Sequence, residues 1–169
     1  ADFFFQVVFV ATACSIVSGA VAERMNQWPF FVLVVFIAAF IYPVQGFWNW
    51  GGGFLKFDGY SDFAGSGTVH LAGAACALAA AMFIGPRVGK YGKVTGKAMG
   101  VFPVAKTNKL YGANIPVAAL GTFILWLGWF GFNGGSQLAI NGVENANAVA
   151  QIFLNTNAAA GGGAMACLI

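Results

Sequence analysis

The sequence predicts an all-α membrane protein, a polytopic helical bundle with about five transmembrane helices. Of its 169 residues, 59% are hydrophobic and only 8% are charged, whereas about a quarter of a soluble domain is charged. A core of this size cannot hide so much apolar surface, so lipid must be its solvent. The apolar residues also fall into runs of about 20, which is the length a helix needs to cross a bilayer.

The runs are separated by charged, polar or glycine-rich breaks. Pro116 suits the first turn of the fourth run, because a helix has no use for an amide N–H there. The fifth run is interrupted by Asn155, Asn157 and the glycines at 161–163. We expect spans at about 3–22, 28–47, 62–84 and 116–132 or 116–136, and a fifth from about 148, after a polar loop at 141–147.

The charged residues sort by side when five spans alternate in direction. One side receives only Lys56, and the other receives seven basic residues: Arg24, Arg87, Lys90, Lys93, Lys97, Lys106 and Lys109. Because basic loops stay in the cytoplasm, the Arg87–Lys109 loop is predicted to be cytoplasmic and the Trp50–Asp62 loop extracytoplasmic. The predicted location is the cell membrane, crossed several times.

The stretch from Asp62 to His70 opens the third run. Asp is a preferred N-cap residue, so Asp62 is expected to start this helix. His70, the only histidine, follows eight residues later, about 12 Å deeper at helical rise and close to the midplane of a bilayer. A lone titratable group at that depth costs free energy and indicates a functional site. In a soluble protein, a satisfied structural histidine would be the simpler interpretation.

This orientation gives the order in which side chains follow one another from the outside of the membrane inward. Asp62, Trp50 and Ser136 form a polar and aromatic mouth, followed by Phe9 and Phe132, and then by His70. Each also has a plain interpretation: Trp50 as an interfacial belt residue, Asp62 as a helix cap, and the two phenylalanines as packing.

The order of these groups suits a small cation that can lose a proton. A Trp face attracts a desolvated cation by up to about 2 kcal/mol, and a hydroxyl accepts a hydrogen bond from ammonium. Phenyl rings offer no hydrogen bonds, so an intact ion between them would lose tens of kcal/mol of solvation by the Born estimate. The pattern favours release of a proton at the mouth and passage of the neutral amine to His70.

Six motifs follow one another along the chain: Phe5-Gln6-Val7-Val8-Phe9, Ala20-Val21-Ala22-Glu23-Arg24-Met25, Trp50-Gly51-Gly52-Gly53, the Asp62 to His70 stretch, Gly85-Pro86-Arg87, and Gly128 to Ser136. In this order they resemble the Amt branch of the Amt/Rh ammonium transporter family. The resemblance covers nearly the whole chain. It implies spans three to seven of an eleven-helix Amt-type fold, so that residues 1–169 form a partial transmembrane domain truncated at both ends.

The resemblance also implies roles for single residues. Trp50 and Ser136 match the recruitment site, with Phe9 adding an aromatic face and Asp62 supporting it. Phe9 and Phe132 match a phenyl gate, and His70 matches the first of two pore histidines, whose partner is absent here. The family is homotrimeric, and a PII-type regulator on the cytoplasmic side is a further expected partner.

Two other functions on the same fold remain open: an ammonium sensor, or transceptor, and an Rh-type channel for NH3 or CO2. A soluble signalling extension would favour the sensor, and a different outer mouth would favour the channel. The single histidine and the absence of any nucleophile and base at suitable spacing argue against an enzyme. No cofactor or metal is expected, because Cys14, Cys76 and Cys167 lack metal-ligand spacing.

Overall fold

The computed structural model describes residues 2–91 and 107–169 as helices and connecting loops. The chain divides into two compact units, Ala1–Leu110 and Tyr111–Ile169, which are considered one at a time. Most of the predicted basic loop lies outside the described residues, including Lys93, Lys97 and Lys106. The all-α prediction is confirmed for the described part of the chain.

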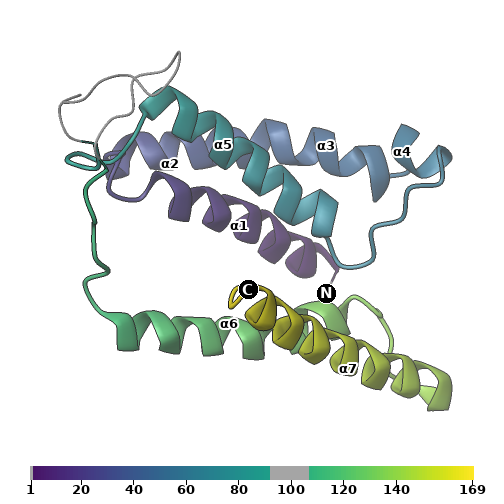
Figure 1. Cartoon of the computed structure of the whole chain (residues 1–169). Helices are drawn as coiled ribbons and strands as arrows, with labels where there is room; N and C mark the ends of the chain where they lie inside the picture. The colour runs from purple at the N-terminus through teal and green to yellow at the C-terminus, as the bar shows by residue number, and fades with distance from the viewer. Residues whose placement is uncertain (1, 92–106) are drawn as a thin grey trace. The chain divides into compact units, whose positions relative to one another are not determined.

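The first unit contains three apolar spans, close to their predicted positions (Figure 1). The first is α1 (Asp2–Val21). The second consists of α2 (Gln27–Phe36), the π-helical segment η1 (Ile37–Ile41) and α3 (Tyr42–Asn49), followed by the short α4 (Phe54–Phe57). The third consists of a π-helical segment, η2 (Ser66–Leu71), continued by α5 (Ala72–Ile84). The prediction for the second span missed its π-helical segment, which directly precedes the turn that holds Pro43.

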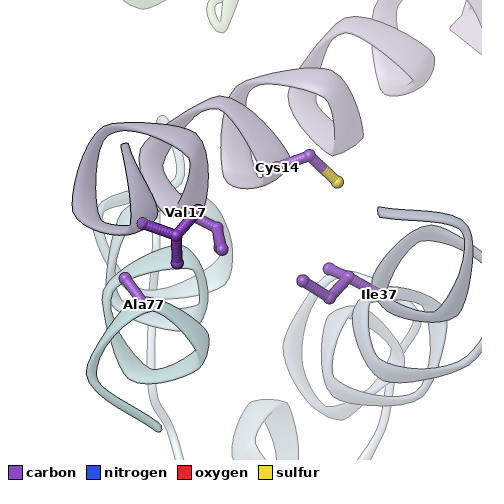
Figure 2. Packing of buried hydrophobic residues seen from close by; sticks show 5 residues of the cluster. Cys14, Val17, Ile37 and Ala77 are labelled. Carbon is purple, nitrogen blue, oxygen red and sulfur yellow. The ribbon is translucent and has the colours of Figure 1, made fainter. Parts of the chain in front are cut away.

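Helices α1 and α5 run side by side and make the main contact of the first unit (Figure 1). Glycine permits this approach, because a Cβ at Gly73 would lie 2.9 Å from the carbonyl oxygen of Ala13. The core beside this contact is small: Val17 is fully buried, and Cys14, Ile37 and Ala77 belong to the same buried cluster (Figure 2). In lipid the hydrophobic effect does not drive helices together. Small residues at a helix contact let the backbones approach closely, so that van der Waals packing stabilises the pair.

The second unit contains two helices that follow one another in the sequence and run antiparallel. They are α6 (Ile115–Gly135) and α7 (Gly142–Ala166). Pro116 occupies the first turn of α6 as predicted, and the side chain of Asn114 caps that helix by accepting from the amide of Val117 at 3.0 Å. The two helices are joined by a hydrogen bond from Asn133 Nδ2 to Thr156 Oγ1 at 3.0 Å.

The predicted start of the fifth helix at 148 is wrong. Helix α7 begins at Gly142 and runs for 25 residues, so most of the expected polar loop is helical, and the glycines at 161–163 do not interrupt it. The polar side chains are accommodated by bonds within the helix, such as the one from Gln151 Nε2 to Asn155 Oδ1 at 3.0 Å.

Four helices in the described residues are long and apolar enough to cross a membrane: Asp2–Val21, Gln27–Phe57, Ser66–Ile84 and Ile115–Gly135. Helix α7 is long enough but is not among them, because its asparagines and glycines lower its mean hydropathy. The described chain therefore has the architecture of a multi-pass membrane protein.

Candidate transport site

The loop between α4 and η2 is organised by the carboxylate of Asp62. One oxygen accepts hydrogen bonds from the amides of Gly65 and Ser66, each at 2.9 Å. The other oxygen accepts from the amides of Gly67 at 2.9 Å and Thr68 at 2.7 Å. The first amides of a helix lack partners within the helix, and here a single carboxylate supplies them.

The prediction that Asp62 directly starts the helix is therefore wrong in position, although its capping role is confirmed. The helix begins at Ser66 and Gly65 holds the N-cap position, three residues after Asp62. Consequently His70 lies about one helical turn inside the helix, much less than the eight residues on which its predicted depth of about 12 Å was based.

These hydrogen bonds also set the charge state of Asp62. Burial raises the pKa of its carboxyl group, but the hydrogen bonds from Thr68, Gly65 and Gly67 outweigh burial and hold the pKa below its ordinary value of 3.8. The carboxylate is therefore ionised at neutral pH, and its oxygens are engaged with the protein backbone.

The indole of Trp50 is fixed from two sides. Its Nε1–H donates to the backbone oxygen of Asp62 at 2.8 Å. Its ring lies against that of Phe9, with centroids 5.4 Å apart and planes inclined at 53°. Phe9 is only 2% exposed and also meets Phe5 edge-on at 4.6 Å. The structure thus brings together the predicted residues Phe9, Trp50 and Asp62.

His70 is anchored by the carbonyl oxygen of Gly65. That oxygen accepts the amide N–H of His70 at 3.0 Å, a π-helical bond, and also lies 3.2 Å from Nδ1 of the same imidazole. A carbonyl can only accept, so this contact is a hydrogen bond when Nδ1 carries the proton and the lone pair is on Nε2. π-helical turns are frequent at functional sites.

Gly65 is a site residue that the sequence analysis did not single out. Its φ of +97° lies in the left-handed region, and an added Cβ would be 2.6 Å from Val69 Cγ2 and 3.1 Å from Trp50 Cη2. Gln45 was missed as well: its Nε2 donates to the carbonyl of Thr68 at 2.7 Å and ties α3 to η2. The spacing of Gly65 after Asp62 was visible in the sequence, whereas the partner of Gln45 was not.

Phe132 and Ser136 lie one turn apart at the end of α6, as predicted. The hydroxyl of Ser136 donates to the carbonyl of Phe132 at 2.9 Å, which leaves the oxygen lone pairs for acceptance. Both residues belong to the second unit, so their meeting with Phe9 and Trp50 stays a prediction. Among the described residues, no three His, Cys, Asp or Glu side chains come close enough to hold a metal ion.

Four apolar helices in the described residues define a polytopic membrane protein. A carboxylate caps its third apolar helix, beside a fixed indole and a histidine in a π-helical turn. Comparison with known proteins agrees. The family model described as Ammonium Transporter Family matches residues 1–169. The chain therefore belongs to the ammonium transporter family.

Two curated relatives illustrate the relationship. The ammonium transporter Amt2 of Archaeoglobus fulgidus is 43% identical over 98% of this chain and 34% of its own length. The ammonium transporter Amt1 of Methanocaldococcus jannaschii is 41% identical over 94% of this chain and 37% of its own length. The chain thus spans about a third of the relatives it matches. Among solved structures, no significant match is found.

Proposed function

We propose that this chain forms the outer mouth and the upper pore of a complete ammonium transporter. The observation that carries the proposal is the linked set of Asp62, Trp50 and His70. The carboxylate of Asp62 is occupied by backbone amides, its backbone oxygen orients the indole, and the loop it caps holds the imidazole. A polar scaffold so fully satisfied is suited to hold recognition groups rigidly.

At the mouth, ammonium meets the indole of Trp50 and the hydroxyl of Ser136. The ring attracts the cation through its quadrupole, and the hydroxyl oxygen accepts one N–H of the ion. Because the Asp62 oxygens are already engaged, this residue contributes negative potential and shape without direct contact with the substrate. Phe9 supports the aromatic face from behind.

Below the mouth, the proposed step is the loss of one proton. NH4+ releases H+ to the outer side, and neutral NH3 moves between the rings of Phe9 and Phe132, where an ion would lose its hydration. His70 receives the molecule next and accepts or donates one hydrogen bond in an otherwise apolar passage. A separate return path for the proton is compatible with this scheme.

The first experiment replaces His70 by Ala in the complete transporter. Ammonium uptake or its selectivity over other cations of similar size is expected to change, because the only imidazole in this segment is removed. Uptake and selectivity are measured in proteoliposomes with a matched amount of folded protein. Unchanged uptake and unchanged selectivity would remove His70 from the mechanism.

The mouth is tested with two tryptophans that lie two residues apart. Trp50→Ala removes the ring that is bonded to Asp62, whereas Trp48→Ala removes a ring that packs on Phe54 at 5.5 Å. We expect the half-saturating ammonium concentration to rise by up to about thirtyfold for Trp50→Ala, which corresponds to the loss of up to about 2 kcal/mol. Equal effects of both substitutions would contradict recruitment at Trp50. The homotrimer and the PII-type regulator remain predictions.

A further inference from the structure

The opposite end of the α1 and α5 pair carries a basic pocket that the proposed transport path does not use. This basic pocket has a volume of about 510 Å³, and its lining includes Arg24, Gly85, Arg87, Lys90 and Tyr91. Three of these side chains are cationic, and no acidic side chain is among the described lining residues. Glu23, just outside the lining, pairs with Arg87 at 3.0 Å, so two positive charges remain in excess.

The position of the basic pocket is set by the ends of two spans. Helix α1 ends at Val21 and α5 ends at Ile84, and both belong to helices long and apolar enough to cross a membrane. Arg24 joins them beyond these ends, because its Nη1 donates to the carbonyl of Gly85 at 3.2 Å. Lipid headgroups lie at the level where membrane helices end.

Arg24 has more hydrogen-bond donors than its bond to Gly85 uses. Arg24 has five N–H donors; one bonds Gly85, and its buried Nε–H has no partner among the described residues. Glu23 turns the chain here with a φ of 61°, a conformation usually left to glycine after a helix. A carboxylate at a helix C-terminus is also unfavourable with the helix dipole. Glu23 is therefore disfavoured both by its backbone conformation and by the helix dipole. Its presence here indicates that the position of its carboxylate beside Arg87 has a role.

We propose that the basic pocket binds the phosphate of an anionic membrane phospholipid. Arg87 and Lys90 supply the charge, Arg24 forms the floor, and the phenol of Tyr91 is a further donor. Phosphate is the anion whose geometry an arginine fork matches, and basic pockets between membrane helices on the cytoplasmic side bind anionic headgroups. The cavity is large enough for such a headgroup, since ligand pockets usually measure about 300–1,000 Å³.

The test measures lipid binding to the complete transporter in neutral detergent, with native mass spectrometry to count bound lipids. Dioleoyl phosphatidylglycerol is the anionic probe, dioleoyl phosphatidylcholine is the zwitterionic probe, and inorganic phosphate tests for a soluble anion. Lys90→Gln removes one pocket charge, and Lys56→Gln is the matched control on α4. Arg24 is left intact, because its bond to Gly85 also links α1 to α5.

We expect Lys90→Gln to weaken binding of phosphatidylglycerol about fivefold, the effect of one basic residue near an anionic headgroup, while Lys56→Gln changes it less than twofold. Lys90→Gln together with Arg87→Gln is expected to weaken it further, and phosphatidylcholine is expected to bind less tightly than phosphatidylglycerol. Equal effects of Lys90→Gln and Lys56→Gln, equal binding of the two lipids, or displacement of lipid by inorganic phosphate at equal concentration would overturn the proposal. Binding is measured without transport, so the result is independent of the proposed ammonium path.

Discussion

The two ends of the α1 and α5 pair are both polar, but different interactions hold them. At the Trp50 end, the carboxylate of Asp62 is bonded to four backbone amides at 2.7–2.9 Å. At the Arg24 end, the ion pair between Arg87 and Glu23 leaves their side chains 41% and 69% exposed. Exposed ion pairs add little to stability, whereas bonds to a charged acceptor add more.

The contrast between the two ends separates charges that stabilise the fold from charges that remain available to a ligand. A carboxylate that is fully engaged fixes a loop and has no oxygen to offer a substrate. Cations that are only partly engaged contribute little to folding and stay available for an outside partner.

The largest effect is expected for Asp62→Asn. An amide has one accepting oxygen, and its NH2 group would face two backbone N–H donors in place of an acceptor, so several bonds are lost together. We expect a fall of about 3 kcal/mol in the free energy of unfolding, measured by denaturation of the complete transporter in detergent. Asp58→Asn, an exposed carboxylate of the same loop, should change it by less than about 0.5 kcal/mol. Similar losses for both variants would contradict the contrast.

The second effect concerns Gly65. Gly65→Ala forces an L side chain to a φ of +97° and toward Val69 and Trp50, whereas Gly52→Ala meets a φ of +83° with nothing within 4 Å. The left-handed conformation alone costs about 1 kcal/mol, and the crowding adds about 1–2 kcal/mol. Gly65→Ala should therefore lower the free energy of unfolding by about 2–3 kcal/mol in the same assay. If Gly52→Ala lowers the free energy of unfolding by as much as Gly65→Ala, the predicted contacts of the new Cβ with Val69 and Trp50 do not contribute.

The third prediction follows from the depressed pKa of Asp62. A carboxyl group whose pKa is lower in the folded state stabilises that state above its unfolded pKa and loses this contribution as the pH falls through the folded pKa. Stability should therefore decline as the pH drops below the ordinary value of 3.8. The decline should be smaller in Asp62→Asn, which has no proton to gain. Equal acid sensitivity of the two proteins, compared by thermal unfolding across this range, would exclude Asp62 as the cause.

The smallest effect is expected at the other end, for Glu23→Gln. The ion pair with Arg87 is exposed, so its loss should change stability by less than about 0.5 kcal/mol. Glu23→Gly should instead gain about 1 kcal/mol, because glycine adopts the φ of 61° without strain. Unfolding of the two variants is compared directly. If Glu23→Gln lowered the free energy of unfolding by about 2 kcal/mol or more, the ion pair at the Arg24 end would stabilise the fold as strongly as the Asp62 hydrogen bonds at the Trp50 end.

Much of the fold follows from the sequence, because apolar runs near 20 residues predict spans directly. The start of α7 was misplaced for a physical reason: polar residues that would favour a loop are accommodated in the helix by bonds between its own side chains, as between Gln151 and Asn155. The π-helical turn at His70 was also invisible, since it depends on the carbonyl of Gly65 and on the detailed geometry of the cap.

The candidate site was predicted in part. Residue types and order along the predicted spans grouped Trp50 with Asp62, the family resemblance added Phe9, and the structure places these three together. The sequence could not show that the Asp62 oxygens accept from four amides. These hydrogen bonds depend on how the loop between Asp62 and the N-cap residue Gly65 folds back onto the start of the helix. Nor could the sequence show the bond from Gln45 to Thr68, which joins residues 23 apart in the chain.

The proposed function holds that Phe9 and Phe132 act together to exclude ions, and a double-mutant cycle on cation current is its sharpest test. Phe9→Ala and Phe132→Ala are made singly and together in the complete transporter, with Phe130→Ala as the control, since that ring packs on Phe153 at 5.3 Å. Current carried by K⁺ should rise, and the Phe9–Phe132 effects should deviate from additivity by about 1 kcal/mol, while Phe9–Phe130 effects add within about 0.5 kcal/mol. Additive effects in both pairs, or K⁺ excluded as well as before, would contradict the claim.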